Sequence, residues 1–252
     1  MKPKKKPKLE IGSFVLEVTR RCNMACDHCL RGGPHPGDLD PRLLRRFLSR
    51  VACIDEVTFT GGEPSLNIGV MRKFYEICEQ YRIPVGGFFV ATNGKENQLE
   101  LAAFLLDRWH KSDDREACGV ALSVDAFHDD ADQTDVVKGL SFYTDSKEHS
   151  PNDLDWPIIA GSAQDNGLGT RRRNTAEKFY LDEPGFPSAT VRVDTLYLSL
   201  NSMVYPDCDL SVEEEDAALE NPDDCPTEAL PAGRAASTLT RRWRKERTQS
   251  DA

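Results

Sequence analysis

Two hydrophobic patterns alternate along the first half of the chain. Short apolar and β-branched runs predict strands, and apolar residues three and four positions apart predict the helices between them. The predicted strands cover residues 13–19, 54–60, 85–94 and 119–125. The predicted helices cover residues 41–51, 67–81 and 97–110, and the first of them starts with Asp40 as N-cap and Pro41 as first helical residue. Strands that alternate with helices in this way indicate parallel βα units.

The pattern is weaker after residue 125. The elements expected there are a helix at 132–143, strands at 155–161 and 190–200, a hairpin return at 203–208 through a turn at Asn201–Ser202, and a helix at 211–220. The last stretch of the chain is rich in Ala, Thr and Arg, and we expect it to be poorly ordered.

Composition limits the classes of partner. The 252 residues carry a formal net charge of −10, which makes nucleic acid an unlikely partner and an acidic membrane a poor one. The charge is uneven, because residues 2–8 are basic whereas residues 207–224 contain nine acids and neither Lys nor Arg. No apolar run is long enough to span a bilayer, and Glu17 interrupts the run that a signal peptide would need. We therefore expect a cytoplasmic protein whose eight cysteines are ligands, catalytic thiols or core residues rather than disulfides.

Three cysteines follow the first predicted strand. Cys22, Cys26 and Cys29 are spaced so that a loop can bring their thiols to one small volume. Thiolates suit iron–sulfur clusters and zinc, and three of them would leave one iron of a [4Fe–4S] cube open to a further ligand. The alternative is a zinc site completed by His28 or a distant cysteine, although structural zinc sites usually have four ligands in two pairs.

The ends of the next three strands are also unusual. They carry GGEP at residues 61–64, ATNG at 91–94 and SVDAFHD at 123–129. In parallel α/β barrels the active site lies at the carboxyl ends of the strands. Four successive strand ends with Gly, polar and metal-binding residues therefore predict one ligand site.

The CxxxCxxC and GGEP motifs, supported by TN at 92–93 and SVD at 123–125, resemble the radical SAM superfamily over about residues 13–165. The resemblance implies an α/β fold, a partial (β/α)6 TIM-like barrel with parallel strands and a short C-terminal β/α extension. It also implies two cofactors, a [4Fe–4S] cluster held by the three cysteines and S-adenosyl-L-methionine (SAM) bound at its open iron. Reductive cleavage of SAM would then give a 5′-deoxyadenosyl radical that takes hydrogen from a substrate, with electrons from a donor such as flavodoxin or ferredoxin.

The resemblance further implies which residues bind SAM. The GGE segment would lie against the SAM amino group, polar residues at the next strand ends would contact its carboxylate, sulfonium or ribose, and His28 would pack on adenine in place of the family's usual aromatic residue. The candidates for SAM binding are Gly61, Gly62, Glu63, Thr92, Asn93, Ser123, Asp125 and His28. The fifth-strand motif, IIAGSA at 158–163, matches the family only in part, which leaves adenine contacts from that strand in doubt. His128 and Asp129 are either substrate groups or polar loop residues.

The remaining cysteines and a basic cluster complete the candidates. Cys53, Cys78 and Cys118 occupy apolar positions and are expected in the core. Cys208 and Cys225 lie where family members carry auxiliary clusters, but two thiols alone are too few for one, so the alternative is a zinc or cluster site that uses them with other ligands. The arginines at 171–173 are either a solvated loop or an anion site.

These observations divide the chain into a basic disordered tail (1–12), a radical SAM core (13–210), and an acidic helix with a poorly ordered tail (211–252). The sequence favours a radical SAM enzyme with a peptide or protein as substrate, in modification or in activation of a protein. The alternatives are a small-molecule enzyme of modified-nucleoside synthesis and, in another class, a zinc or iron–sulfur protein that binds nucleic acid.

Overall fold

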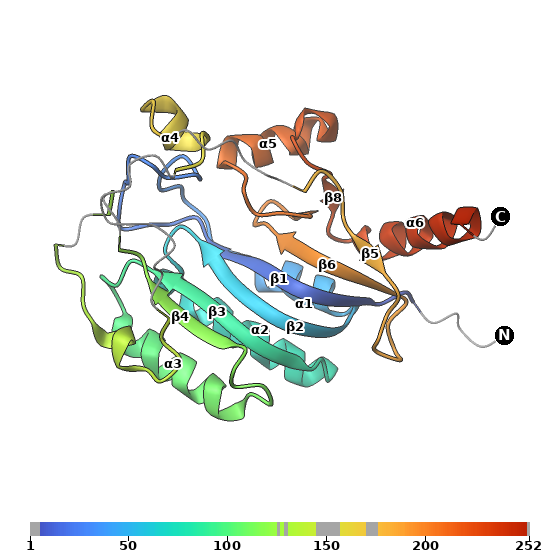
Figure 1. Cartoon of the computed structure of the whole chain (residues 1–252), viewed down its shortest axis with the longest axis horizontal. Coiled ribbons are helices and arrows are strands. Elements are labelled where there is room, and N and C mark those ends of the chain that lie inside the picture. The colour runs from blue at the N-terminus through green and yellow to red at the C-terminus, as the bar shows by residue number, and fades with distance from the viewer. Residues whose placement is uncertain (1–5, 125–126, 129–130, 145–156, 170–175, 251–252) are drawn as a thin grey trace.

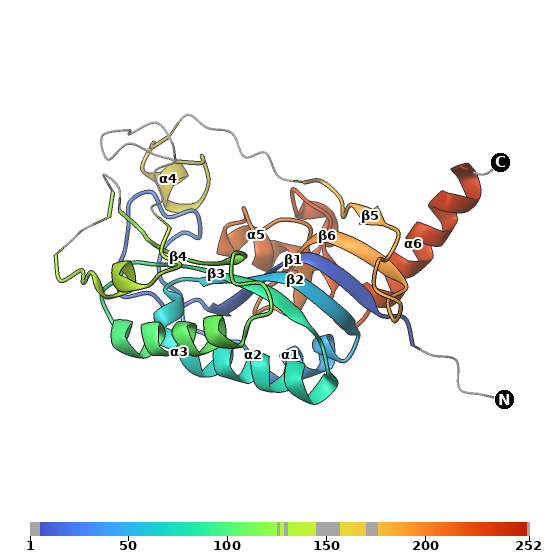
Figure 2. The same cartoon turned by 60° about the horizontal axis from the view of Figure 1, so that its bottom comes forward.

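The computed structural model describes residues 6–124, 127–128, 131–144, 157–169 and 176–250. Its first half repeats a strand followed by a helix. The strands are β1 (Leu9–Thr19), β2 (Val51–Gly61), β3 (Val85–Thr92) and β4 (Cys118–Leu122). The helices α1 (Pro41–Leu48), α2 (Ile68–Tyr81) and α3 (Gln98–Lys111) lie together on one face of the sheet (Figure 2). The predicted βα units are thus confirmed, including the Asp40 cap, whose side chain accepts from the Arg42 amide.

The sheet continues on both sides of β1. Its order is β4-β3-β2-β1-β6-β7-β8, with β5 (Leu181–Asp182) paired to β6 (Val191–Leu198). β1 pairs in parallel with both β2 and β6, so the strand that leads into the cysteine loop is central. β7 (Met203–Tyr205) and β8 (Leu230–Pro231) extend the sheet with antiparallel pairs. This mostly parallel sheet confirms the partial TIM-like α/β fold.

The strand order has one feature that the sequence did not indicate. The fifth parallel strand, β6, joins the free edge of β1 rather than extending the sheet beyond β4. At the β4 edge the described chain makes a single parallel bridge between Val120 and Tyr143. The C-terminal part of the chain is therefore placed beside the start of the cysteine loop (Figure 1).

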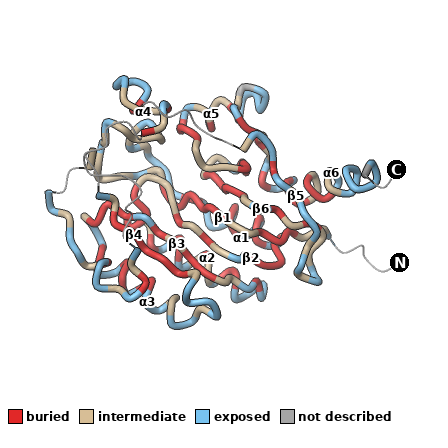
Figure 3. Tube along the Cα trace, viewed as in Figure 1, coloured by how far each residue is buried: buried red, intermediate tan, exposed pale blue. Residues whose placement is uncertain are grey.

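The sheet separates two cores. The larger one lies between the sheet and α1–α3, where the Phe14 ring lies 5.5 Å from that of Phe47 and the Phe59 ring lies 5.5 Å from that of Phe74. A smaller one contains Tyr197 and residues of β7 and α5 (Val212–Glu220). Figure 3 shows buried backbone running along the strands and into this C-terminal part. C-terminal residues thus form a second layer over the sheet.

Several sequence expectations are corrected. β1 starts at Leu9, inside the expected tail, because Leu9 and Ile11 are fully buried. The helix expected at 132–143 is only the 3₁₀ turn η2 (Val136–Gly139). The strand expected at 155–161 does not form over its described residues, because 157–160 are bends with one isolated bridge residue and Gly161 begins the short helix α4 (Gly161–Asp165).

The C-terminal end differs most from expectation. It forms α6 (Ala235–Ser250), a helix of 16 residues, rather than a poorly ordered tail. Ala235, Ala236 and Leu239 are buried in the larger core. These apolar residues at the start of the helix pack it against the core. The rest of the helix is mostly polar, so the sequence showed no continuous apolar face that would predict a helix.

Other expectations are confirmed. The hairpin turn forms with Ser202 at φ 69°, and β6 and β7 pair through it. Cys53, Cys78 and Cys118 are buried. In the part of the chain that the structure describes, every helix is too short or too polar to cross a bilayer.

Candidate functional site

The cysteine loop leaves the carboxyl end of β1 and is fixed by backbone hydrogen bonds. The Cys29 amide donates to the Cys26 carbonyl at 3.1 Å, and the Gly32 amide donates to the Cys29 carbonyl at 3.1 Å. The Ser162 amide of α4 also donates to the Cys29 carbonyl, at 2.9 Å. Gly161 is required there, because a Cβ atom would lie 2.3 Å from the Leu30 carbonyl oxygen. The loop is therefore held by its own backbone hydrogen bonds and by α4.

A cavity of about 410 Å³ opens beside this loop. It lies at the carboxyl ends of β1 to β4, as the sequence predicted. Eight predicted site residues line it: Cys22, Cys26, Cys29, His28, Gly62, Glu63, Asn93 and Ser123. Gly61 and Thr92 lie behind the lining, and Asp125, Asp129 and residues 171–173 fall outside the described residues.

The two glycines of the GGEP segment are needed for packing against the cysteine loop. A Cβ atom on Gly61, which has φ +138°, would lie 1.9 Å from the Thr19 carbonyl oxygen. A Cβ atom on Gly62 would lie 2.3 Å from the Arg21 carbonyl oxygen. The Gly62 and Glu63 amides donate to these same carbonyls at 2.8 and 2.9 Å. The GGEP segment and the start of the cysteine loop thus form one unit.

Glu63 joins this unit to β3. Its carboxylate is buried and accepts three hydrogen bonds, from the Ser65 amide at 2.9 Å, the Thr92 hydroxyl at 2.7 Å and the Asn93 amide at 2.8 Å. A carboxylate has about four acceptor positions, so some capacity remains toward the cavity. Thr92 consequently acts as a support for Glu63 rather than as part of the cavity wall.

Asn93 ties the end of β3 to the cysteine loop. Its amide nitrogen donates to the Asn23 side-chain oxygen at 2.7 Å, and its own side-chain oxygen accepts from the Lys95 amide at 3.1 Å. The chain after β4 is tied to the same place, because the side-chain Nε2 of Gln133 donates to the Asn93 carbonyl at 2.9 Å and to the Ser123 carbonyl at 3.1 Å. Three strand ends are therefore connected by side-chain hydrogen bonds.

His28 lies in an aromatic group. Its ring is 5.0 Å from the Phe127 ring and 4.8 Å from the His128 ring, centroid to centroid. His128 also lines the cavity. The residue that precedes the third cysteine is thus packed against the segment that follows β4.

The structure adds cavity residues that the sequence did not single out. They include Met24 and Leu30 of the cysteine loop, Pro157 before α4, and Asp209, together with Thr58, Phe59 and Thr60 of β2 and Ala91 of β3. Ile158, from the partly matching motif at 158–163, also lines the cavity. Met24 and Leu30 could have been found from their place inside or directly after the cysteine motif. Asp209 depends on a distant segment of the chain returning to the sheet's edge, which gives no local sequence signal.

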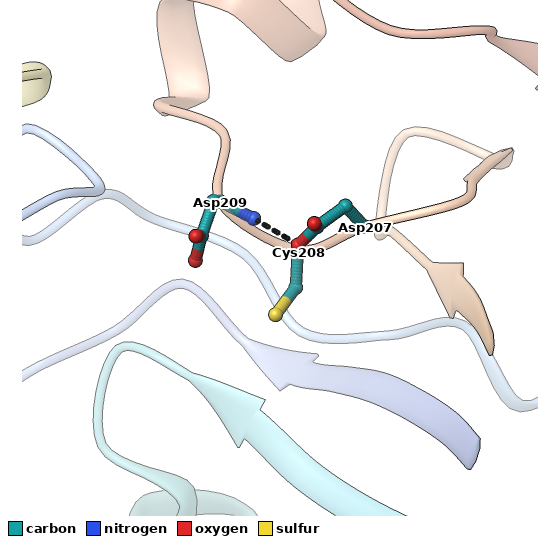
Figure 4. A group of neighbouring side chains, drawn as sticks. All are labelled: Asp207, Cys208 and Asp209. Atoms are coloured by element: carbon teal, nitrogen blue, oxygen red, sulfur yellow. Dashed lines mark hydrogen bonds between the residues drawn. The ribbon is translucent and has the colours of Figure 1, made fainter. Parts of the chain in front are cut away.

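Asp207, Cys208 and Asp209 form a compact group after β7 (Figure 4). In the described part of the chain, these are the only three His, Cys, Asp or Glu side chains whose ligand atoms all lie within 4.8 Å of one another. Cys22, Cys26 and Cys29 line one cavity together. Three soft thiolates suit a [4Fe–4S] cluster with one open iron, whereas a structural zinc site usually has four protein ligands.

The surroundings of Cys22 favour the protonated form of its thiol when no metal is bound. Burial raises the pKa of its thiol, and Glu63 and Cys29 raise it further. The metal-free site therefore favours the thiol, and a metal must displace the proton to bind. Cys208 is similar, since burial and the neighbouring Asp209 and Asp207 raise its pKa to about 12.

The sequence model of the radical SAM superfamily matches residues 16–149, just over half of the chain. An uncharacterized protein of Methanocaldococcus jannaschii is 31% identical over 68 residues, and a probable GTP 3′,8-cyclase of Methanopyrus kandleri is 42% identical over 74 residues. These matches cover 26% and 28% of this chain, and only 24% and 23% of the relatives' own length.

Solved structures give weaker likenesses. The structure of anSMEcpe with bound AdoMet is 12% identical, with a TM-score of 0.46 over 81% of this chain and 75% of that chain. Streptococcus suis SuiB bound to the precursor peptide SuiA is 19% identical, with a TM-score of 0.29 over 45% of this chain and 24% of that chain.

The chain belongs to the radical SAM superfamily. Members of this superfamily use a [4Fe–4S] cluster and SAM.

Proposed function

We propose that Cys22, Cys26 and Cys29 hold the [4Fe–4S] cluster and that the cavity beside them binds SAM. The observation that carries this proposal is that the three thiols line one cavity together with Gly62 and Glu63. The chemistry that the bound cofactors supply is one-electron reductive cleavage of SAM into methionine and a 5′-deoxyadenosyl radical, which abstracts hydrogen from the substrate.

The protein's own residues position SAM. The Gly62–Glu63 segment lies where it can meet an ammonium group, and a carboxylate is the natural partner of that charge. Asn93 and Ser123 offer hydrogen bonds to carboxylate or ribose, and His28 offers a ring to adenine. Gly61 and Thr92 act indirectly, through packing against Thr19 and through the hydrogen bond to Glu63. Asp125 keeps its expected role, contact with the carboxylate, sulfonium or ribose of SAM.

The proposed setting is the cytoplasm, with a flavodoxin or ferredoxin as electron donor. All eight cysteines lie in the described part of the chain, and none forms a disulfide. Thiols persist in a reducing compartment, which would also protect a cluster with an open iron.

The substrate that we favour is a peptide or protein. A cavity of about 410 Å³ is near the lower end of the range for ligand pockets, and the cofactors would take most of it. The reacting atom of the substrate would then enter from the mouth, as a side chain of a larger molecule can. The exposed apolar residues Val124 and Ile159 adjoin the lining residues Ser123 and Ile158. Exposed apolar residues next to the lining suit a peptide.

Charge favours a basic peptide. Three acids of α5 are exposed: Glu213, Asp216 and Glu220. They belong to the segment that also brings Asp209 into the cavity. We assign Asp209 and His128 to contact with the substrate, because they line the cavity from segments that the cysteine and GGEP motifs do not use.

A nucleotide or nucleoside is the second candidate. Its support is the 42% identity over 74 residues to a probable GTP 3′,8-cyclase. The shared stretch is a minor part of either chain, so the substrate of that relative is a hypothesis for this one.

The first experiment measures 5′-deoxyadenosine. Protein reconstituted with iron and sulfide without oxygen is mixed with SAM and dithionite, and the nucleoside is measured by mass spectrometry. The wild type and a Cys118→Ala control, which changes a buried cysteine of β4, should form it. Cys26→Ala should not. Normal SAM cleavage by Cys26→Ala would overturn the ligand assignment.

The second experiment separates the substrate classes. Basic peptides, acidic peptides and GTP, each deuterated at carbon, are added to the same reaction. We expect basic peptides to transfer deuterium to 5′-deoxyadenosine. Asp209→Asn should reduce this transfer, whereas its cleavage of SAM in the absence of substrate should be unchanged. Transfer from GTP alone would contradict the peptide assignment and support the second candidate.

A further inference from the structure

Four buried side chains of alternating charge meet beside the cysteine loop. We call them the charge ring: Glu17, Arg20, Arg31 and Glu215. Arg20 lies 3.3 Å from the Glu17 carboxylate and 2.6 Å from that of Glu215. Arg31 lies 2.6 Å from Glu17 and 2.5 Å from Glu215. Each arginine thus contacts both carboxylates, and the ring is closed.

The charge ring is buried and satisfied by neighbours. The side chains of Glu17 and Glu215 have no exposed surface, and those of Arg20 and Arg31 are 10% and 13% exposed. The Tyr197 hydroxyl donates to Glu215 at 2.8 Å. Burial alone would lower the pKa of Arg31, but Tyr197, Glu215 and Glu17 outweigh it and hold that pKa well above its usual value. The Arg31 guanidinium therefore stays charged at any physiological pH.

Ser199, the residue after β6, connects the two carboxylates. Its hydroxyl lies 3.0 Å from a Glu17 oxygen and 2.5 Å from a Glu215 oxygen, and the Leu200 amide donates to Glu17 at 2.8 Å. The ring therefore joins β1, β6 and α5 at one point.

The two arginines of the charge ring lie at the two ends of the cysteine loop. Arg20 stands two residues before Cys22, and Arg31 stands two residues after Cys29. The two arginines thus bracket the three cysteines, and both are held by Glu215, a residue of the C-terminal helix α5. Arg31 also holds the backbone just before α5, because it donates to the Leu210 carbonyl at 2.5 Å.

We propose that the charge ring is a clamp that fixes the two ends of the cysteine loop, and that Glu215 is a positioning residue for cluster assembly. The inference deepens the proposed function and rests on it for the identity of the bound group. A loop that must place three thiols on one cluster binds it more tightly when its ends are already fixed. The conformational entropy lost on ordering the loop is then lost during folding rather than during cluster binding. Buried ion pairs add little stability in general, but they fix geometry, which is the property needed here.

The clamp is tested with Glu215→Gln, which keeps the shape of the side chain and removes its charge. Glu213→Gln, an exposed change on the same helix, is the matched control. Tyr197→Phe is a milder second variant, which removes one hydrogen bond to Glu215 and leaves every charge of the ring in place.

The first readout is hydrogen–deuterium exchange of the metal-free protein. In Glu215→Gln, exchange of the amides of Cys29 and Gly32 should rise about tenfold, and in Tyr197→Phe by a smaller factor, while β2 to β4 keep their protection. Unchanged loop protection in both variants, or equal loosening of the whole sheet, would overturn the clamp.

The second readout is cluster retention. Reconstituted Glu215→Gln should lose iron to a chelator about tenfold faster than the wild type and the Glu213→Gln control. Equal rates would overturn the role in assembly. Hydrogen exchange is measured on the metal-free protein, whereas SAM cleavage is measured on the reconstituted wild type. An exchange result against the clamp therefore does not contradict the proposed function, and a wild type that fails to cleave SAM does not invalidate the exchange result.

Discussion

Glu63→Gln tests how much this buried carboxylate stabilises the site through its hydrogen bonds. The carboxylate accepts three hydrogen bonds from buried donors. A glutamine side chain can keep the two at Oε1, from Ser65 and Thr92, but it turns an NH₂ group toward the Asn93 amide. One hydrogen bond to a charged group, about 1.5–3 kcal/mol, is lost, and the other two weaken to neutral bonds by about 1 kcal/mol each.

The expected loss is about 3–5 kcal/mol in the free energy of unfolding. For a chain of this size, it corresponds to a fall of about 10 °C in Tm. Thermal unfolding of the metal-free protein by circular dichroism measures it, with the exposed Glu116→Gln as control. A Tm within about 1 °C of the wild type would refute the reasoning, because the three hydrogen bonds would then carry no net stability.

Three further predictions follow from the fold and the cysteines. Leu239→Ala should lower the free energy of unfolding by about 2–5 kcal/mol in a denaturant titration, because this side chain of α6 is fully buried; no change would mean that α6 is not docked. Gly62→Ala should fold but take up much less iron on reconstitution, because the added Cβ displaces the Arg21 carbonyl; full iron content would contradict this. Cys208 should react with iodoacetamide at pH 8 about 10³-fold more slowly than an ordinary thiol, with a rate that rises about tenfold per pH unit, because a pKa raised to about 12 keeps the proton on sulfur. Peptide mapping measures this rate, and rapid labelling at pH 8 would be the contrary result.

The sequence predicted what is local. The βα units follow from hydrophobic period, and their strand ends carry the residues that line the cavity. The spacing of Cys22, Cys26 and Cys29 directly after a strand predicted that their loop lies at the carboxyl end of that strand, and all three residues line the cavity there. A loop between a strand and the helix of the same unit must start at that end of the strand.

What depends on long-range pairing was not predictable. The register of β6 beside β1 leaves no sequence signal, and the order of strands followed from it. Arg20 and Glu215 are 195 residues apart, so neither could be recognised as half of a buried pair. The GGEP glycines were expected to serve close approach to SAM, whereas the structure shows an additional reason, contact with the backbone of the cysteine loop.

The most direct test of the central claim is a Mössbauer spectrum of protein reconstituted with ⁵⁷Fe under anaerobic conditions, recorded with and without SAM. We predict a [4Fe–4S] spectrum in which addition of SAM changes the signal of one iron and leaves the other three, because Cys22, Cys26 and Cys29 supply only three of the four iron ligands. A spectrum that SAM does not alter, or a protein that binds zinc at these cysteines and takes up no iron, would contradict the account.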